Sequence, residues 1–267
     1  MIRRTRLAWI PFAVAAIALL VPCAPHAAEL PSSALRMAWL RLPGGADHSS
    51  ELASWAQEIR VRTSIDILPS AVGVRPEDPA IFHYPLLYWG GDRAVARLSD
   101  QAIVHLRQHL STGGTLIIDN TGRTEPSHAF DQSMRRELER ISPQAIQRIP
   151  SSHVLLRSFY RLERPVGRRA DAHDLEGVRV GSHMAVIYTR NDLAGALARA
   201  PVGGYALAVV PGGETQREQA FRLAVNLVMY ALCLDYKDDH THVMHLLRYR
   251  RGSRVPEPAA PQGDDDP

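Results

Sequence analysis

The chain has 267 residues, of which 45% are hydrophobic and 22% are charged, with 31 basic and 28 acidic side chains. This length and apolar content suffice for one large folded domain and exclude a fibrous or wholly disordered protein. Two cysteines, Cys23 and Cys233, are too few for a disulfide-rich scaffold.

The first 28 residues have the pattern of an export signal. Three arginines within the first six residues precede an uncharged apolar run over 7–21, and small residues follow up to Ala28. We therefore predict a signal peptide over 1–28 that is cleaved and directs the protein to the periplasm or cell envelope. The alternative is a retained anchor, but this apolar run is shorter than the roughly 20 residues of a membrane span.

Cleavage would change the charge balance of the protein. The signal carries three of the 31 basic residues and no acidic one, which leaves 28 basic and 28 acidic side chains. A balanced chain lacks the basic surface of a nucleic-acid-binding protein, so we predict no nucleic-acid partner and no integral membrane segment after cleavage. The remaining thiol, Cys233, lies in an apolar helical pattern, where it would be protonated and unreactive.

The mature chain begins with alternating strand and helix patterns. A strand is predicted over 35–40, and strands are also expected over 65–68 and 81–89, with Pro85 marking a break or an edge in the last. Between the first two, helical spacing predicts an amphipathic helix that buries Leu52, Trp55, Ala56 and Ile59.

The clearest local unit lies over residues 81–118. Ser99 is placed to cap a helix, Leu98 and Ile103 flank it as a hydrophobic staple, and Gly113 and Gly114 end the helix. An apolar strand over 115–118 follows. This order predicts a βαβ unit with a parallel strand pair.

The second half continues the pattern. Strands are predicted over 178–188 and 206–210, with a short helix or loop over 191–200 between them. Two further helices are expected: an amphipathic one that buries Phe130, Met134, Leu138 and Ile141, and one that starts at a capping box of Thr215 and Glu218 and buries Phe221, Ala224, Val225, Val228, Ala231 and Leu232. We predict one doubly wound, mostly parallel α/β domain over 29–250 and a disordered tail over 251–267.

Candidate catalytic residues follow the predicted strands. Ligands of open α/β sheets bind beyond the carboxyl ends of the strands, and Asp119 and Asn120 directly follow an apolar strand. A carboxylate there is suited to act as a base, a nucleophile or a metal ligand, and Asp192 could supply a second acid. The alternative is that Asp119 caps the next helix or bonds to loop amides, and that Asp192 serves a turn.

Other candidate sites have weaker patterns. Ligand binding could involve residues of the strand ends and the glycine turns, namely Gly90, Gly91, Asn191, Gly212 and Gly213. Asp239, His242 and His245 could bind zinc or copper, although a solvated helix explains the same pattern. A nucleophile elbow and cofactor fingerprints are missing from the sequence, so we predict no cofactor.

A series of motifs spans nearly the whole mature chain, at residues 62–65, 84–88, 113–120, 185–188 with 191–193, 226–232, 236–239 and 242–243. In this order they resemble the domain-of-unknown-function family 4159. The resemblance implies a fold similar to class I glutamine amidotransferases, in which a nucleophilic cysteine follows the strand after the double glycine. Here that position reads Asp119-Asn120-Thr121-Gly122, without a cysteine. The resemblance also implies an envelope partner, either a MoxR-type ATPase or a von Willebrand factor A protein.

Two functions therefore remain open from the sequence. The first is a non-catalytic, exported binding or assembly module on an amidotransferase-like scaffold that lacks the nucleophile. The second is a periplasmic hydrolase that uses Asp119 and Asp192, with Asn120 or a histidine in support. The fold alone does not decide between them.

Overall fold

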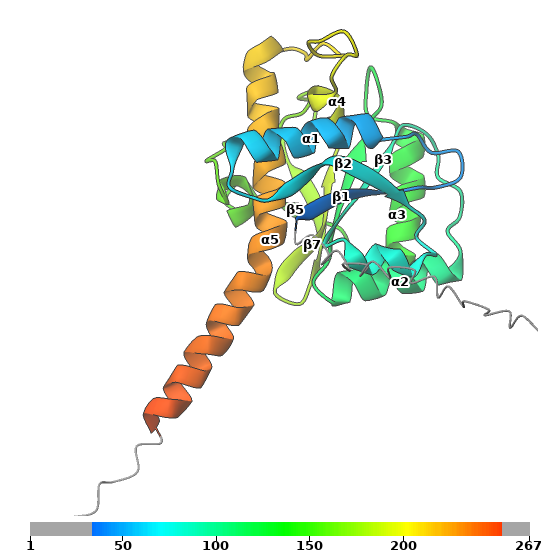
Figure 1. Cartoon of the computed structure of the whole chain (residues 1–267). Coiled ribbons are helices and arrows are strands. Elements are labelled where there is room, and N and C mark those ends of the chain that lie inside the picture. The colour runs from blue at the N-terminus through cyan, green and yellow to red at the C-terminus, as the bar shows by residue number, and fades with distance from the viewer. Residues whose placement is uncertain (1–33, 253–267) are drawn as a thin grey trace, which may run out of the picture. The chain divides into compact units, whose positions relative to one another are not determined.

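The computed structural model describes residues 34–252 and, of these, side chains up to Leu232. Figure 1 shows a sheet with helices on both sides. Its strands are β1 (Leu35–Leu40), β2 (Ile67–Val74), β3 (Leu86–Gly91), β4 (Thr115–Asn120), β5 (Gln147–Ile149), β6 (Leu175–Val180) and β7 (His183–Thr189). The helices are α1 (Ser49–Arg62), α2 (Asp100–Ser111), α3 (His128–Ile141), α4 (Leu193–Leu197) and α5 (Gly213–Gly252), with short 3₁₀ helices η1 (Pro79–His83) and η2 (Val154–Arg157).

The seven strands of the described residues form one sheet in the order β2-β1-β3-β4-β7-β6-β5. The strands β2, β1, β3, β4 and β7 are parallel, whereas β6 and β5 are antiparallel additions at one edge. Helix α1 connects β1 to β2, and α2 connects β3 to β4, as parallel pairs require. The predicted mixed α/β class with a mostly parallel sheet is confirmed.

Both faces of the sheet are buried by helices. Met37 of β1 and Ile117 of β4 belong to one core with residues of α1 and α5. Their chain neighbours Ala38 and Leu116 belong to the other core, which contains α2 and α3. Alternate side chains point to opposite faces of a strand, so burial on both faces explains why these strands read as continuous apolar runs.

Several elements lie where the sequence predicts them. The strand over 35–40 and the predicted face of α1 are confirmed, with Leu52, Trp55, Ala56 and Ile59 all buried. Ser99 caps α2, because its Oγ accepts a hydrogen bond from the Ala102 amide at 3.2 Å. The helix around Phe130 and a short helix within 191–200 are also present.

Two early strand predictions are wrong in their limits. The strand expected over 65–68 is β2, which begins at Ile67 and continues to Val74. The strand expected over 81–89 is divided: η1 occupies its first residues and β3 starts only at Leu86. The helical turn forms because Asp78 accepts a hydrogen bond from the Ala80 amide, with Pro79 at its first position.

Three later predictions are also wrong. The single strand expected over 178–188 is two antiparallel strands, β6 and β7, which are joined by a turn at Gly181 with φ of 59°. Residues 206–210 form no strand, because the amides of Ala206 and Val210 bond to loop carbonyls outside the sheet. Helix α5 starts at Gly213, ahead of the predicted capping box, and β5 was not predicted.

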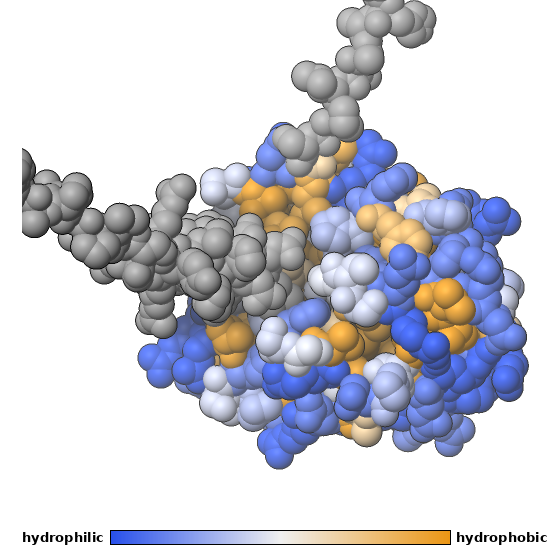
Figure 2. All heavy atoms as spheres, turned by 90° about the horizontal axis from the view of Figure 1, so that it is seen from below, coloured by the Kyte–Doolittle hydropathy of each residue, from blue (hydrophilic) through white to orange (hydrophobic). Residues whose placement is uncertain are grey.

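On the face seen in Figure 2, hydrophobic areas are interrupted by hydrophilic side chains. Exposed large hydrophobic side chains come from separate elements, among them Val61, Val104 and Val202. Within the described residues, none of the helices combines the length and the apolar character that crossing a bilayer demands. The predicted signal over 1–28 and most of the predicted tail lie outside the described residues.

Candidate functional site

A cavity lies at the carboxyl edge of the parallel strands. In the sheet, β2 lies on one side of β1 and β3 lies on the other side, so the strand order reverses at β1. Open α/β sheets bind ligands at such a reversal. The cavity has a volume of about 150 Å³. Its polar lining residues are Glu51 in the first turn of α1 and, from the loops after β1, β3, β4 and β7, His48, Asp92, Thr121, Arg123 and Asp192. We call it the carboxyl-edge cavity.

Asp119 is buried beneath this edge. It is the fifth residue of β4 and has no exposed surface. Its Oδ1 accepts a hydrogen bond from the Leu193 amide at 3.0 Å, and its Oδ2 accepts from the Ala194 amide at 2.9 Å and from the Tyr88 hydroxyl at 3.1 Å. The side chain therefore holds the first turn of α4 against the sheet. The predicted alternative, a cap of the next helix, is wrong in its helix, because α3 is capped by Ser127.

Burial also shifts the proton affinity of Asp119. Removal from water raises its pKa to about 7, and the nearby charge of Asp192 acts in the same direction. The hydrogen bonds from Ala194, Leu193 and Tyr88 favour the ionised form and oppose this rise. The influence of Asp192 means that the structure brings the two predicted carboxylates near one another.

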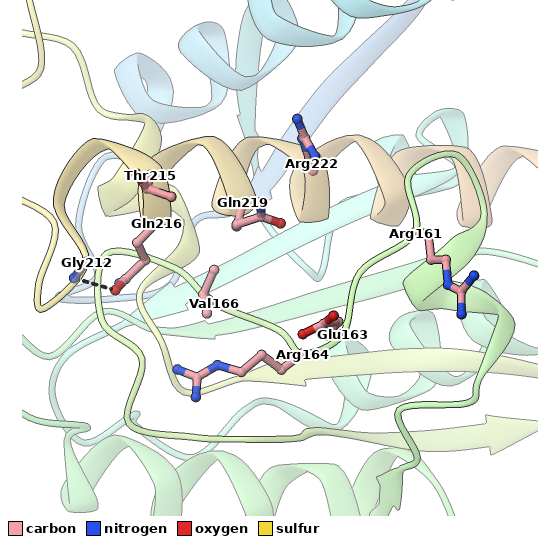
Figure 3. Close-up of a pocket in the computed structure, with 9 residues that line it drawn as sticks. All are labelled: Arg161, Glu163, Arg164, Val166, Gly212, Thr215, Gln216, Gln219 and Arg222. Carbon is pink, nitrogen blue, oxygen red and sulfur yellow. Dashed lines mark hydrogen bonds between the residues drawn. The ribbon is translucent and has the colours of Figure 1, made fainter.

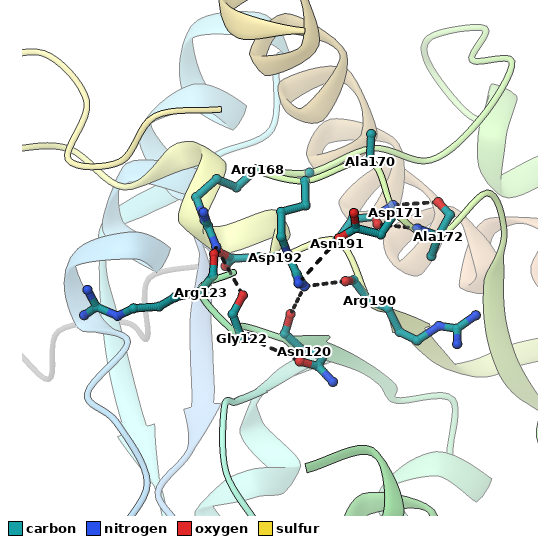
Figure 4. A network of polar contacts seen from close by, with 12 residues as sticks. Asn120, Gly122, Arg123, Arg168, Ala170, Asp171, Ala172, Arg190, Asn191 and Asp192 are labelled. Atoms are coloured by element: carbon teal, nitrogen blue, oxygen red, sulfur yellow. Dashed lines mark hydrogen bonds and ion pairs between the residues drawn. The ribbon is translucent and has the colours of Figure 1, made fainter. Parts of the chain in front are cut away.

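Asp192 is held by a buried ion pair. It adopts a left-handed backbone conformation with φ of 54°, and its Oδ1 accepts from the Gly195 amide at 3.1 Å. Its other oxygen pairs with Arg168, which also donates to the carbonyls of Gly122 at 3.1 Å and Arg123 at 2.5 Å. Figure 4 shows Arg168 joining Asp192 to the loop after β4. Burial raises the pKa of Asp192, and Arg168 opposes the rise.

The two predicted asparagines are also committed to internal bonds. Asn120 accepts from the Ser127 amide at 2.7 Å and donates to the Ser127 carbonyl at 2.9 Å, which closes the loop after β4. Asn191 donates to the Pro165 and Ala172 carbonyls at 3.2 and 2.8 Å. Both side chains therefore fix loops, as turn-forming asparagines commonly do.

The candidate glycines lie at two separate places. At Gly90 a Cβ atom would lie 2.6 Å from His48 Nε2, and at Gly91 it would lie 2.2 Å from the Phe130 ring, so close packing requires glycine at both. Gly212 lines a different groove near the start of α5, and Gly213 has φ of 57° there. The candidate glycines therefore do not converge on one ligand.

Sequence reasoning did not identify four polar residues of the cavity: His48, Glu51, Asp92 and Arg123. His48 is 5% exposed, its ring meets Tyr88 edge-on at 5.2 Å, and its Nε2 has no hydrogen-bond partner among the described residues. A usable signal was present. The loop after the first strand also leaves the carboxyl edge, and the same rule that selected Asp119 applies to it.

The predicted metal ligands cannot be placed. Asp239, His242 and His245 lie beyond the residues whose side chains are described, as does Cys233. Over the side chains of residues 34–232, the histidine, cysteine and carboxylate groups form no cluster of three suited to a metal ion.

Comparison with known families identifies the domain. A family model for a domain of unknown function, DUF4159, matches residues 37–232. The chain belongs to this family. The DUF4159 match runs from β1 into α5 and includes the whole lining of the carboxyl-edge cavity. Among curated proteins, nothing matches the chain significantly.

Proposed function

We propose that this DUF4159 domain is a non-catalytic binding or assembly module that is exported to the periplasm or cell envelope. The observation that carries the proposal is the state of Asp119. It is the best-placed carboxylate of the sheet edge, yet it has no exposed surface and both of its oxygens accept hydrogen bonds. A base or nucleophile must reach its substrate to within about 3 Å, which this packing prevents.

The turn after β4 supports the same proposal. In a class I glutamine amidotransferase-like scaffold this turn would carry the attacking cysteine, whereas this chain has Asn120, Thr121 and Gly122. Thr121 lines the carboxyl-edge cavity beside His48, but no hydrogen bond between their side chains is formed in the part of the chain that the structure describes. A hydroxyl without a base is a weak nucleophile.

The cavity is suited to hold a polar group of a partner. Glu51, in the first turn of α1, and Arg123, in the loop after β4, bring opposite charges to its lining. Such a site can bind the side chains of another protein without any chemical step. By family resemblance, the partner would be a MoxR-type ATPase or a von Willebrand factor A protein of the envelope.

A periplasmic hydrolase is the second candidate. It is favoured by the raised pKa of Asp119, because perturbed carboxylates near a cavity often act as acids or bases. It requires a motion of α4 that exposes Asp119 to substrate. Hydrolysis of an envelope-derived ester or amide that is lost in Asp119→Asn, with folding retained, would establish this candidate instead.

The binding proposal can be tested in the native envelope. Tagged wild-type protein, an E51Q/R123Q variant of the cavity and an R60Q/R97Q control would be cross-linked and purified in parallel. Arg60 and Arg97 are exposed, and no side-chain contact is formed by either within the described residues. We expect one partner to be recovered with the wild type and the control and to be reduced at least fivefold with E51Q/R123Q. Recovery of the bare protein, or equal recovery with all three, would contradict the proposal.

A further inference from the structure

A second and larger concave site lies along the start of α5. It has a volume of about 500 Å³ and lies between the first turns of α5 and the loop over residues 161–166. Figure 3 shows the loop side chains and the helix side chains on opposite sides of it. Its exposed or half-buried polar lining consists of Arg161, Glu163, Arg164, Thr215, Gln219 and Arg222. We call it the arginine groove.

The cations of this groove are weakly engaged by the rest of the protein. Arg161 is exposed and makes no side-chain hydrogen bond or ion pair within the described residues. Arg164 is exposed and has only long contacts, at 3.3 Å to His173 and 3.4 Å to the Ala170 carbonyl. Arg222 pairs with Glu218 at 2.9 Å. Two guanidinium groups therefore remain available to a ligand.

The groove also has a favourable dipole and a fixed shape. The free amides at the start of a long helix attract anions, and Thr215 lies in the first turn of α5. Buried Gln216 accepts from the Gly212 amide at 3.0 Å and donates to the carbonyls of Gly167 and Val210 at 2.9 and 2.8 Å. These bonds fasten the helix start to neighbouring loops, so the groove is pre-formed.

The chemistry of the lining favours a peptide with carboxylate side chains. Guanidinium groups bind carboxylates through paired hydrogen bonds. Gln219 and Thr215 can donate to and accept from the peptide groups of an extended segment. Glu163 would repel a densely charged phosphate group, but it can accept a hydrogen bond from a peptide N–H.

We propose that the arginine groove binds an acidic peptide segment of a protein partner, with Arg161 and Arg164 pairing its carboxylates. The inference deepens the proposed binding function and rests on it for the nature of the partner. The arginine groove is separate from the carboxyl-edge cavity, since the two share no lining residue.

The test uses the full-length purified chain and a fluorescein-labelled peptide of alternating aspartate and glutamate. Fluorescence anisotropy would give its affinity for the wild type, for R161Q/R164Q and for the matched R60Q/R97Q control. We expect R161Q/R164Q to weaken binding at least tenfold, whereas the control, which loses the same net charge elsewhere, changes it less than twofold. Binding should also weaken between about 0.05 M and about 0.3 M salt.

Two further peptides complete the test. A peptide of alternating asparagine and glutamine should not bind, and equal binding of this uncharged probe would overturn the proposal. A peptide of residues 255–267, which contains Asp264, Asp265 and Asp266, tests the chain's own acidic segment. Preferential binding of that peptide would replace the protein partner with a second copy of this chain. If E51Q/R123Q loses envelope capture but still binds the acidic peptide, the result supports the role of the cavity. Binding at the groove is then shown to be independent of the cavity.

Discussion

The carboxyl-edge cavity and the arginine groove use charge in opposite ways. Beside the cavity, Asp119 and Asp192 are almost fully buried, and their oxygens are bonded to amides, to Tyr88 or to Arg168. In the groove, Arg161 and Arg164 are exposed and have few internal partners. Charged groups with buried internal partners maintain a fold, whereas exposed and weakly paired ones are available to a ligand.

This difference predicts how substitutions divide between stability and binding. Removing one member of a buried pair leaves the other without a partner in a medium of low dielectric constant. Removing an exposed arginine costs little, because water solvates whatever remains. Substitution of the buried charges beneath the cavity should therefore destabilise the fold, whereas substitution of the exposed arginines of the groove should only weaken ligand binding.

The largest effect is expected at Arg168. An Arg168→Met substitution keeps most of the volume but leaves Asp192 and the carbonyls of Gly122 and Arg123 without their donor. We expect a loss of about 3–5 kcal/mol in the free energy of unfolding, measured by urea denaturation at neutral pH. A loss below about 1 kcal/mol would show that the bonds of Arg168 contribute little to stability, and it would contradict the contrast with the groove.

The next effect concerns Asp119 and depends on pH. Its pKa in the folded protein is raised to about 7, so the folded state retains a proton that the unfolded chain releases near pH 4. Its contribution to stability is therefore fully present below about pH 4 and is lost as the pH rises toward about 7. The stability difference between wild type and Asp119→Asn should shrink by about 3 kcal/mol over this range.

Urea unfolding of both proteins at a series of pH values would measure that difference. Because only the difference is compared, carboxylates with lowered pKa values, such as Asp131 and Glu137, cancel. Parallel pH profiles for the two proteins would mean that Asp119 has the same pKa in the folded and unfolded states. In that case the hydrogen bonds from the α4 amides and Tyr88 would balance the effect of burial.

His109, which lies away from both regions, tests whether burial alone makes stability depend on pH. It is buried on α2, and burial lowers its pKa to about 4. A histidine with a lowered folded pKa supplies stability above about pH 6.5 that is lost as the pH falls toward 4. We expect His109→Gln to remove about 2 kcal/mol of this acid sensitivity. Equal acid sensitivity of the wild type and His109→Gln would contradict the role of burial.

Much of the fold was predictable, because local signals and tertiary packing agree there. The apolar spacing in α1 and the Ser99 cap of α2 each specify their element without help from distant residues. The errors occur where a turn or a loop hydrogen bond ends a strand that the apolar pattern alone would continue. Gly181 turns one apolar run into a hairpin, and loop partners take the amides of Ala206 and Val210 away from any strand.

The candidate site was predictable only in position. The rule for open sheets placed Asp119 at the correct edge, but its role depends on amides 74 and 75 residues away in α4. Arg168, which lies 24 residues before Asp192, could not be paired with it from sequence spacing. The arginine groove was missed because its loop and helix meet only in the folded chain, and Gly212 was its one predicted member.

The smallest effect is expected at the groove itself. R161Q/R164Q should change the free energy of unfolding by less than about 0.5 kcal/mol, because both side chains are exposed and their few contacts are long. Measured beside Arg168→Met, this variant distinguishes the two kinds of charge within one protein. R161Q/R164Q should lose peptide binding and keep near-native stability, whereas Arg168→Met should lose stability. If R161Q/R164Q instead unfolded as readily as Arg168→Met, its loss of binding would report unfolding. The arginines would then belong to the fold, as the buried groups beside the carboxyl-edge cavity do.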